Sequence, residues 1–177
     1  FGKIKDWDTK NVTNMDDMVS LLSGDYNGDS KDNLLTDWNI DINNFYNELD
    51  IDISTNINAF NFNEDISNWD TSNVTSMKRM FYNANLFNIN IITKTYKPYK
   101  DYESTLFNVN EEHTAWDISN VKNMESMFEN APNFVQRIHL MSVSPDTTTD
   151  MFKNATSYIN KYSTLNGFNN GSPTSDF

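Results

Sequence analysis

The stretch WDTSNVTSMKRMFYNANLF, residues 69–87, recurs with few changes as WDISNVKNMESMFENAPNF at residues 116–134. Near-identical segments along one chain indicate stacked copies of a single structural unit. Two weaker copies follow the same template, WDTKNVTNMDDMV at 7–19 and DMFKNATSY at 150–158. Aligning all copies on their alanine positions gives a unit of about 24 residues and predicts about six turns within residues 1–165.

Several segments depart from this template. The acidic stretch GDYNGDSKDNLLTD, residues 24–37, has no counterpart in other units and is interpreted as an insertion. The units near 38–62 and at 88–109 are degenerate, and the last unit carries Leu140 where the template has Trp. The tail 166–177 is rich in Asn, Gly, Ser and Pro, which predicts a polar C-terminal cap or linker.

Within a unit, the apolar residues recur at intervals of three and four positions. This spacing predicts one face of a short helix, entered after an N-capping Asn73 in one copy and Asn120 in the other, with Ser72 and Ser119 as the adjacent alternative caps. Alternating apolar residues before the helix predict a short strand or extended segment. The helix-face residues, which we expect to form the structural core, are Val74, Met77, Phe81, Ala84, Val121, Met124, Phe128 and Ala131.

A single unit cannot bury its own Trp, Val, Met and Phe side chains. Burying one large apolar side chain contributes about 1.5–3 kcal/mol, which becomes available only when neighbouring units cover each other. The sequence therefore predicts an α/β repeat protein, a solenoid in which each turn presents the same surface to the next. Seven of the eight methionines lie on the template, so we expect them in the core rather than on a binding face.

Composition excludes several classes of function. The chain has 177 residues and a net charge of −12, with only 13 Lys and Arg residues, which argues against binding nucleic acid. It has no cysteine, and no apolar run reaches the roughly 20 residues that span a bilayer. We therefore expect no thiolate metal site and no membrane insertion by this chain.

The acidic insertion is the one candidate for a metal site. Asp25, Asn27 and Asp29 have the alternating spacing of calcium ligands in an EF-hand loop. Against calcium, Ser30 occupies the position where the loop needs glycine for its sharp turn, and Thr36 replaces the final carboxylate. A solvated acidic loop is the favoured alternative, and no other cofactor is predicted.

No catalytic residues are predicted. His113 and His139 have no Ser, Cys or second His at the spacing of a known catalytic motif. Asp8, Asp70 and Asp117 recur at one template position, and such recurrence indicates turn chemistry in which a carboxylate accepts from nearby backbone N–H groups.

The tryptophans of the template allow two interpretations. Trp7, Trp69 and Trp116 also share one position and, if exposed, would form a ladder able to stack on sugars. The favoured alternative places each of them half-buried at a corner of its unit, with its N–H bonded to the backbone.

The motif W-D-T-S-N-V-T-S-M-x-x-M-F at 69–81 resembles the repeat of BspA-like leucine-rich-repeat surface proteins. Related repeats occur in mollicute lipoproteins and in proteins of large algal viruses. The resemblance implies an LRR-like (leucine-rich-repeat-like) solenoid that lies outside the cell or on a particle and that binds or adheres without catalysis.

The sequence thus predicts a non-enzymatic surface protein for adhesion or for binding protein or glycan, located extracellularly or at the cell surface. The alternative is a structural component of a large assembly, such as a virion surface or minor capsid protein, whose partners are neighbouring subunits. The two alternatives share the expectation that the repeats serve contacts rather than chemistry.

Overall fold

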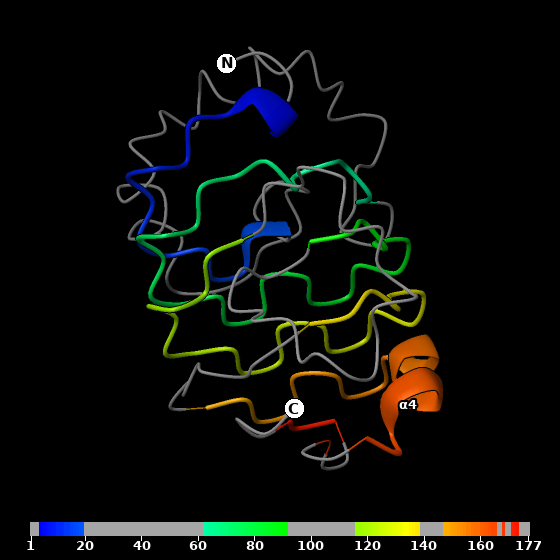
Figure 1. Ribbon diagram of the computed structural model, residues 1–177. Coiled ribbons are helices and arrows are strands. Elements are labelled where there is room, and N and C mark those ends of the chain that lie inside the picture. The colour runs from blue at the N-terminus through cyan, green and yellow to red at the C-terminus, as the bar shows by residue number, and fades with distance from the viewer. Residues whose placement is uncertain are drawn as a thin grey trace, which may run out of the picture.

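The computed structural model describes residues 4–19, 62–91, 116–138, 147–165, 168 and 171–173. Two short helices have both ends within these residues: the 3-10 helix η1 at Ile4–Asp6 and the α-helix α4 at Thr156–Tyr162. Most other described residues form turns and extended segments, which lie above one another in successive layers (Figure 1).

The copies of the template stack in register. Parallel β-bridges join Asn14 to Ser76, Ser76 to Asn123, and Asn123 to Thr147. These four residues occupy the same template position, so each layer repeats the one before it without a shift. We call the stacked segments rungs 1 to 4: residues 7–19, 69–87, 116–134 and 147–155.

Neighbouring rungs are separated by very different lengths of chain. Bonded residues lie 62 positions apart between rungs 1 and 2, 47 apart between rungs 2 and 3, and 24 apart between rungs 3 and 4. Rung 2 is therefore bonded directly to rung 3, and the predicted unit at 88–109 adds no rung between them. Most of that unit, like the insertion at 24–37, lies outside the described residues.

The segments predicted as short helices are turns. In rung 2 the N–H groups of Val74, Met80 and Ala84 bond to carbonyls three residues earlier, and Arg79 and Asn83 have φ of 54° and 60°. Residues in the left-handed region interrupt a right-handed helix. Consecutive turns therefore place the apolar residues, spaced three and four positions apart, on one side of the rung. Rung 3 has the same turns, with Ser126 and Asn130 in the left-handed region.

Each rung has one edge of donors and one edge of acceptors over most of its length. Four N–H groups of rung 2 donate to carbonyls of rung 3 at 2.9–3.0 Å, whereas three carbonyls of rung 2 accept from N–H groups of rung 1. The donors are Met77, Arg79, Phe81 and Asn83, and the acceptors are Ser76, Lys78 and Met80. The stack is therefore directional, because its two ends present opposite hydrogen-bonding groups.

The core contains columns of aromatic side chains from successive rungs. The rings of Phe81, Phe128 and Phe152 stack at centroid distances of 5.1 and 5.3 Å. A second column, with Phe134 between Phe87 and Tyr158, has distances of 5.8 and 5.7 Å. The eight core residues named from the sequence are all buried, at 0–1% exposure, and the seven methionines on the template are buried at 0–3%.

Candidate functional site

The candidate metal ligands, and the histidines for which no catalytic role is predicted, lie outside the described part of the chain. These are Asp25, Asn27 and Asp29 of the acidic insertion, and the two histidines, His113 and His139. Among the residues that the structure describes, no group of three or more His, Cys, Asp or Glu side chains is arranged to hold a metal ion.

The recurring aspartates form turns. The Asp70 carboxylate accepts from the Ser72 N–H at 3.0 Å and from the Ser72 hydroxyl at 2.6 Å. Asp117 accepts from the N–H of Ser119 at 3.0 Å, and Asp8 accepts from that of Lys10 at 3.2 Å. These carboxylates thus have the local role predicted from their recurrence.

Threonines next to these aspartates tie each corner to the following rung. The Thr9 hydroxyl donates to the Asp70 carbonyl, and the Thr71 hydroxyl donates to the Asp117 carbonyl, each at 3.0 Å. Both threonines are buried, at 2% and 0% exposure. A buried hydroxyl with a satisfied partner stabilises the contact between rungs and is not available to a ligand.

The template tryptophans pack against other parts of the stack. Trp69 and Trp116 are buried, and the Trp116 ring N–H donates to the Ile66 carbonyl at 3.0 Å. The Trp7 ring stacks on the Trp69 ring at 6.1 Å with an interplanar angle of 9°. The sugar-stacking interpretation is wrong for Trp69 and Trp116, because buried rings cannot stack on a sugar. The predicted bond from the ring N–H to the backbone is seen at Trp116, and Trp7 is partly buried.

Asparagine amides connect the rungs instead of capping helices. The Asn73 side chain donates to the Lys10 carbonyl and the Asn120 side chain donates to the Ser72 carbonyl, each at 2.7 Å. The helix caps predicted at Asn73 and Asn120 are therefore replaced by bonds to the preceding rung, since no helix follows either residue.

A second amide ladder runs through the left-handed asparagines. The Asn130 side chain donates to Asn83 at 2.9 Å, and the Asn154 side chain donates to Asn130 at 2.8 Å. Asparagine suits both demands of this position, because it tolerates positive φ and its amide can donate and accept along the stack.

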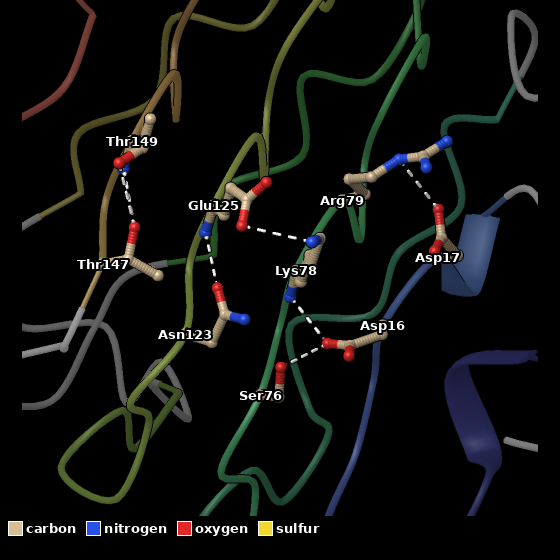
Figure 2. Close-up of polar contacts among 9 residues, drawn as sticks. All are labelled: Asp16, Asp17, Ser76, Lys78, Arg79, Asn123, Glu125, Thr147 and Thr149. Atoms are coloured by element: carbon tan, nitrogen blue, oxygen red, sulfur yellow. Dashed lines mark hydrogen bonds and ion pairs between the residues drawn. The ribbon is translucent and has the colours of Figure 1, made fainter. Parts of the chain in front are cut away.

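Charged side chains of opposite sign face each other across rungs 1 to 3 (Figure 2). The Asp16 carboxylate accepts from the Ser76 hydroxyl and from the Lys78 N–H, the latter at 2.8 Å. The Lys78 ammonium lies 3.1 Å from the Glu125 carboxylate, so the sign of charge alternates along this template position.

The adjacent template position carries a second ion pair. The Arg79 guanidinium lies 3.1 Å from the Asp17 carboxylate, and it also lies over the Tyr82 ring, 4.5 Å from the centroid. Sequence reasoning did not single out these residues. Comparing the aligned copies would have found them, because Asp-Asp in the first copy faces Lys-Arg in the second.

Burial changes the acidity of this cluster. It raises the pKa of Asp16, against the opposing effect of the bonds from Ser76 and Lys78. Burial also raises the pKa of Asp17, against the attraction of the Arg79 charge. Both carboxylates face cationic or N–H groups of rung 2, which favours a role in the contact between rungs.

One strip of side chains repeats on the outside of rungs 1 to 3. Its members flank the buried template valine in each rung, so that exposed and buried residues alternate. We call it the polar strip: Asn11, Thr13, Asn73, Thr75, Asn120 and Lys122. All six residues are exposed, and four side-chain amides or hydroxyls in rungs 1 and 2 are followed by Asn120 and a lysine in rung 3.

The described part of the chain contains no helix with the length and hydropathy needed to span a bilayer. No curated protein and no solved structure shows a significant match to the chain. One family model matches it twice, over residues 2–111 and 54–168. Overlapping matches are expected of a sequence that repeats internally, and together they span most of the chain. The chain therefore belongs to the family described as Mycoplasma protein of unknown function, DUF285.

Proposed function

We propose that this chain is a non-enzymatic recognition module, displayed at an exterior surface, that mediates adhesion by binding a protein or a glycan through its polar strip. The observation that carries the proposal is that template residues inside the stack and those on its outside differ in what they contact. The recurring aromatic and Met side chains are buried between the rungs, whereas the polar strip repeats on the exposed outside, where bonds from Asn73, Thr75 and Asn120 to the preceding rung hold it in place.

The polar strip has the chemistry of a binding surface with a repeating ligand. Stacked rungs are about 4.8 Å apart, so the strip presents amide and hydroxyl groups at a constant interval. Its backbone is fixed on both sides of each rung by hydrogen bonds, including those between Thr13, Thr75 and Lys122 at 2.8 Å. A preorganised row of polar groups loses little entropy on binding an extended peptide or a chain of sugars.

Kinship with the BspA-like surface proteins forms part of this proposal. The sequence motif at 69–81 resembles their repeat, and the matched family is described as a Mycoplasma protein, which fits the mollicute relatives that this resemblance implies. In such a setting, a rigid array of short repeats serves to present contacts to another surface, with no reaction taking place.

The proposal is tested with strip variants against panels of glycans and extracellular-matrix proteins. Thr75→Arg places a long charged side chain in the centre of the strip, while its backbone bonds to rungs 1 and 3 remain. We expect binding of the captured ligand to fall at least tenfold, which corresponds to about 1.4 kcal/mol. Asn160→Arg, on the exposed face of α4, makes the same change of charge away from the strip and serves as the matched control.

Two results would count against the proposal. Equal loss of binding in both variants would indicate a nonspecific effect of charge on an acidic protein. Unchanged binding in Thr75→Arg, with a captured ligand in hand, would place the contact surface elsewhere on the chain.

The second candidate is a structural component of a large assembly. It is favoured by the observation that rungs make the same contacts whether 62, 47 or 24 residues separate them. A surface that does not depend on its connector is suited to contacts between subunits. Chemical crosslinking in the native source, followed by identification of the crosslinked residues, separates the two candidates: crosslinks to identical or particle subunits favour assembly, whereas crosslinks to host molecules favour adhesion.

A further inference from the structure

The last rung of the stack ends in backbone donors. Rung 3 donates to rung 4 from the N–H groups of alternate residues, at 2.8–3.0 Å. These donors are Met124, Ser126, Phe128 and Asn130. The equivalent N–H groups of rung 4, which belong to Thr148, Asp150, Phe152 and Asn154, turn away from rung 3 by the same periodicity. They form the donor edge of rung 4.

A short C-terminal segment lies against this donor edge. The N–H of Phe152 donates to the Gly171 carbonyl at 2.7 Å, and the N–H of Asp150 donates to the Ser172 hydroxyl at 2.9 Å. The Thr148 hydroxyl donates to the Pro173 carbonyl at 2.5 Å. The partners advance from 171 to 173 as rung 4 descends from 152 to 148, so this segment runs antiparallel to a stack that is otherwise parallel.

The segment closes the edge and offers no continuation of it. All three of its groups that meet rung 4 are acceptors, and Pro173 has no N–H to donate to a further strand. The Phe168 ring packs against Phe152 and Tyr158 at 6.1 and 6.0 Å, which covers the end of both aromatic columns. We call Phe168 together with residues 171–173 the C-terminal cap.

The directionality of the stack decides what the uncovered edge would bind. Two donor edges cannot pair with each other, so a twofold dimer through rung 4 is excluded on hydrogen-bonding grounds. The complementary surface is an acceptor edge such as rung 2 presents to rung 1. By the same periodicity, the Asp16 and Met18 carbonyls of rung 1 turn away from rung 2 and have the required polarity.

We propose that the C-terminal cap blocks a head-to-tail assembly surface, and that its displacement lets the donor edge of rung 4 bind the acceptor edge of rung 1 in a second copy of this chain. The contact between rungs holds without a short connector, as the 62-residue separation of rungs 1 and 2 demonstrates, so it can form between molecules. A contact of this kind joins different surfaces and builds open chains of subunits. This inference is independent of ligand binding by the polar strip.

The experiment removes the cap and measures mass by sedimentation velocity from low to high micromolar concentration. The truncated chain ends at Leu165, and its control lacks only residues 174–177 and so keeps the cap. We expect the control and the full chain to remain monomeric. The weight-average mass of the truncated chain is expected to at least double with rising concentration and to continue past the dimer.

A point variant tests the same idea at full length. Gly171 has φ of 85°, and a Cβ there would lie 3.3 Å from the Lys153 nitrogen and the Phe152 carbonyl carbon. Gly171→Val therefore loosens the cap, and we expect self-association that the matched exposed substitution Thr164→Ala does not produce. A synthetic peptide of residues 166–177, added in excess, is expected to return both the truncated chain and Gly171→Val to monomers.

Three outcomes would overturn the inference. The first is a truncated chain that retains the near-ultraviolet circular dichroism of the full chain and stays monomeric. The second is assembly that stops at the dimer, since this would indicate a twofold contact. The third is aggregation that the cap peptide does not reverse, which would identify exposed apolar surface, and not the donor edge, as its cause.

Discussion

The ring of Phe81 stacks on the ring of Phe128, with centroids 5.1 Å apart and an interplanar angle of 12°. They belong to rungs whose equivalent residues lie 47 positions apart in the sequence. Phe128 in turn stacks on Phe152 at 5.3 Å, so it has an aromatic neighbour on both faces. The column therefore couples three rungs, and truncating one of its rings should destabilise the stack.

Phe128→Ala is expected to lower the free energy of unfolding by about 3–5 kcal/mol, because it leaves a cavity between two rings. Phe81→Ala should cost a similar amount. Leu86→Ala, at a side chain that is 50% exposed, is the control and should change stability by less than about 0.5 kcal/mol. Urea unfolding followed by fluorescence measures all three, and a loss below about 1 kcal/mol at Phe128 would contradict the column.

Asn130 tests the cost of the left-handed backbone separately from that of the amide ladder. Asn130→Gly keeps the positive φ accessible but removes the bonds to Asn83 and Asn154, so we expect a loss of about 1–2 kcal/mol. Asn130→Ala removes the same bonds and adds about 1–2 kcal/mol of backbone strain. Thermal unfolding of both variants should show Ala as the less stable, and equal stabilities would mean that the backbone relaxes.

Asp16 should make stability fall as pH rises. Burial raises the pKa of its carboxyl, so the folded state disfavours the charged form. The contribution of Asp16 to the free energy of unfolding is fully present below the ordinary Asp pKa of about 3.9. It is lost as the pH rises through the raised pKa of the folded state. Asp16→Asn keeps an acceptor oxygen facing Ser76 and Lys78 but does not titrate, so this variant should gain stability relative to the parent between about pH 3 and pH 7.

Asp8 provides the control of opposite sign. A hydrogen bond from the Lys10 side chain lowers the pKa of Asp8, so its favourable contribution is present above the ordinary pKa and is lost as pH falls. Asp8→Asn should therefore lose stability relative to the parent as pH rises. Denaturant unfolding at several pH values measures both slopes, and slopes of the same sign would refute the assignment.

Tyr158 should remain un-ionised for as long as the chain is folded. Its side chain is buried between Phe134 and Phe152, and burial raises the pKa of the phenol well above its usual range. Stability is therefore complete below the ordinary Tyr pKa of about 10 and is lost above it, as ionisation drives unfolding.

In an alkaline titration followed by absorbance, a buried tyrosine ionises only when the chain unfolds, which produces an abrupt step. In Tyr158→Phe this step should be smaller by the contribution of one tyrosine. The variant loses the hydroxyl that accepts from the Ile138 N–H at 3.4 Å, a long bond whose removal should cost about 0.5–1.5 kcal/mol at neutral pH. A titration step unchanged from that of the parent would mean that Tyr158 ionises in the folded state.

The asparagines at repeated template positions link successive rungs of the stack by hydrogen bonds. An amide can accept from the rung on one side and donate to the rung on the other, as Asn130 does between Asn83 and Asn154. A serine or aspartate at this position could not continue both bonds in the same way, because neither carries an amide donor and a carbonyl acceptor together. Spacing alone could not reveal these ladders, since each bond joins residues from different rungs.

The sequence by itself determined which side chains face inward, because Val74, Met77, Phe81 and Ala84 recur at the same template positions as Val121, Met124, Phe128 and Ala131. Recurrence can be read from the sequence without knowing the fold, and so can the turns that the aspartates form with residues two positions later. Only the tertiary structure decided the backbone conformation and the order of the rungs. The same apolar spacing fits a helix or consecutive turns, and the choice follows from N–H groups that find carbonyls in the next rung. Which rung is next depends on which complementary edges meet in space. The sequence separations of 47 and 62 positions matter less, because the entropic cost of closing a loop grows only slowly with its length.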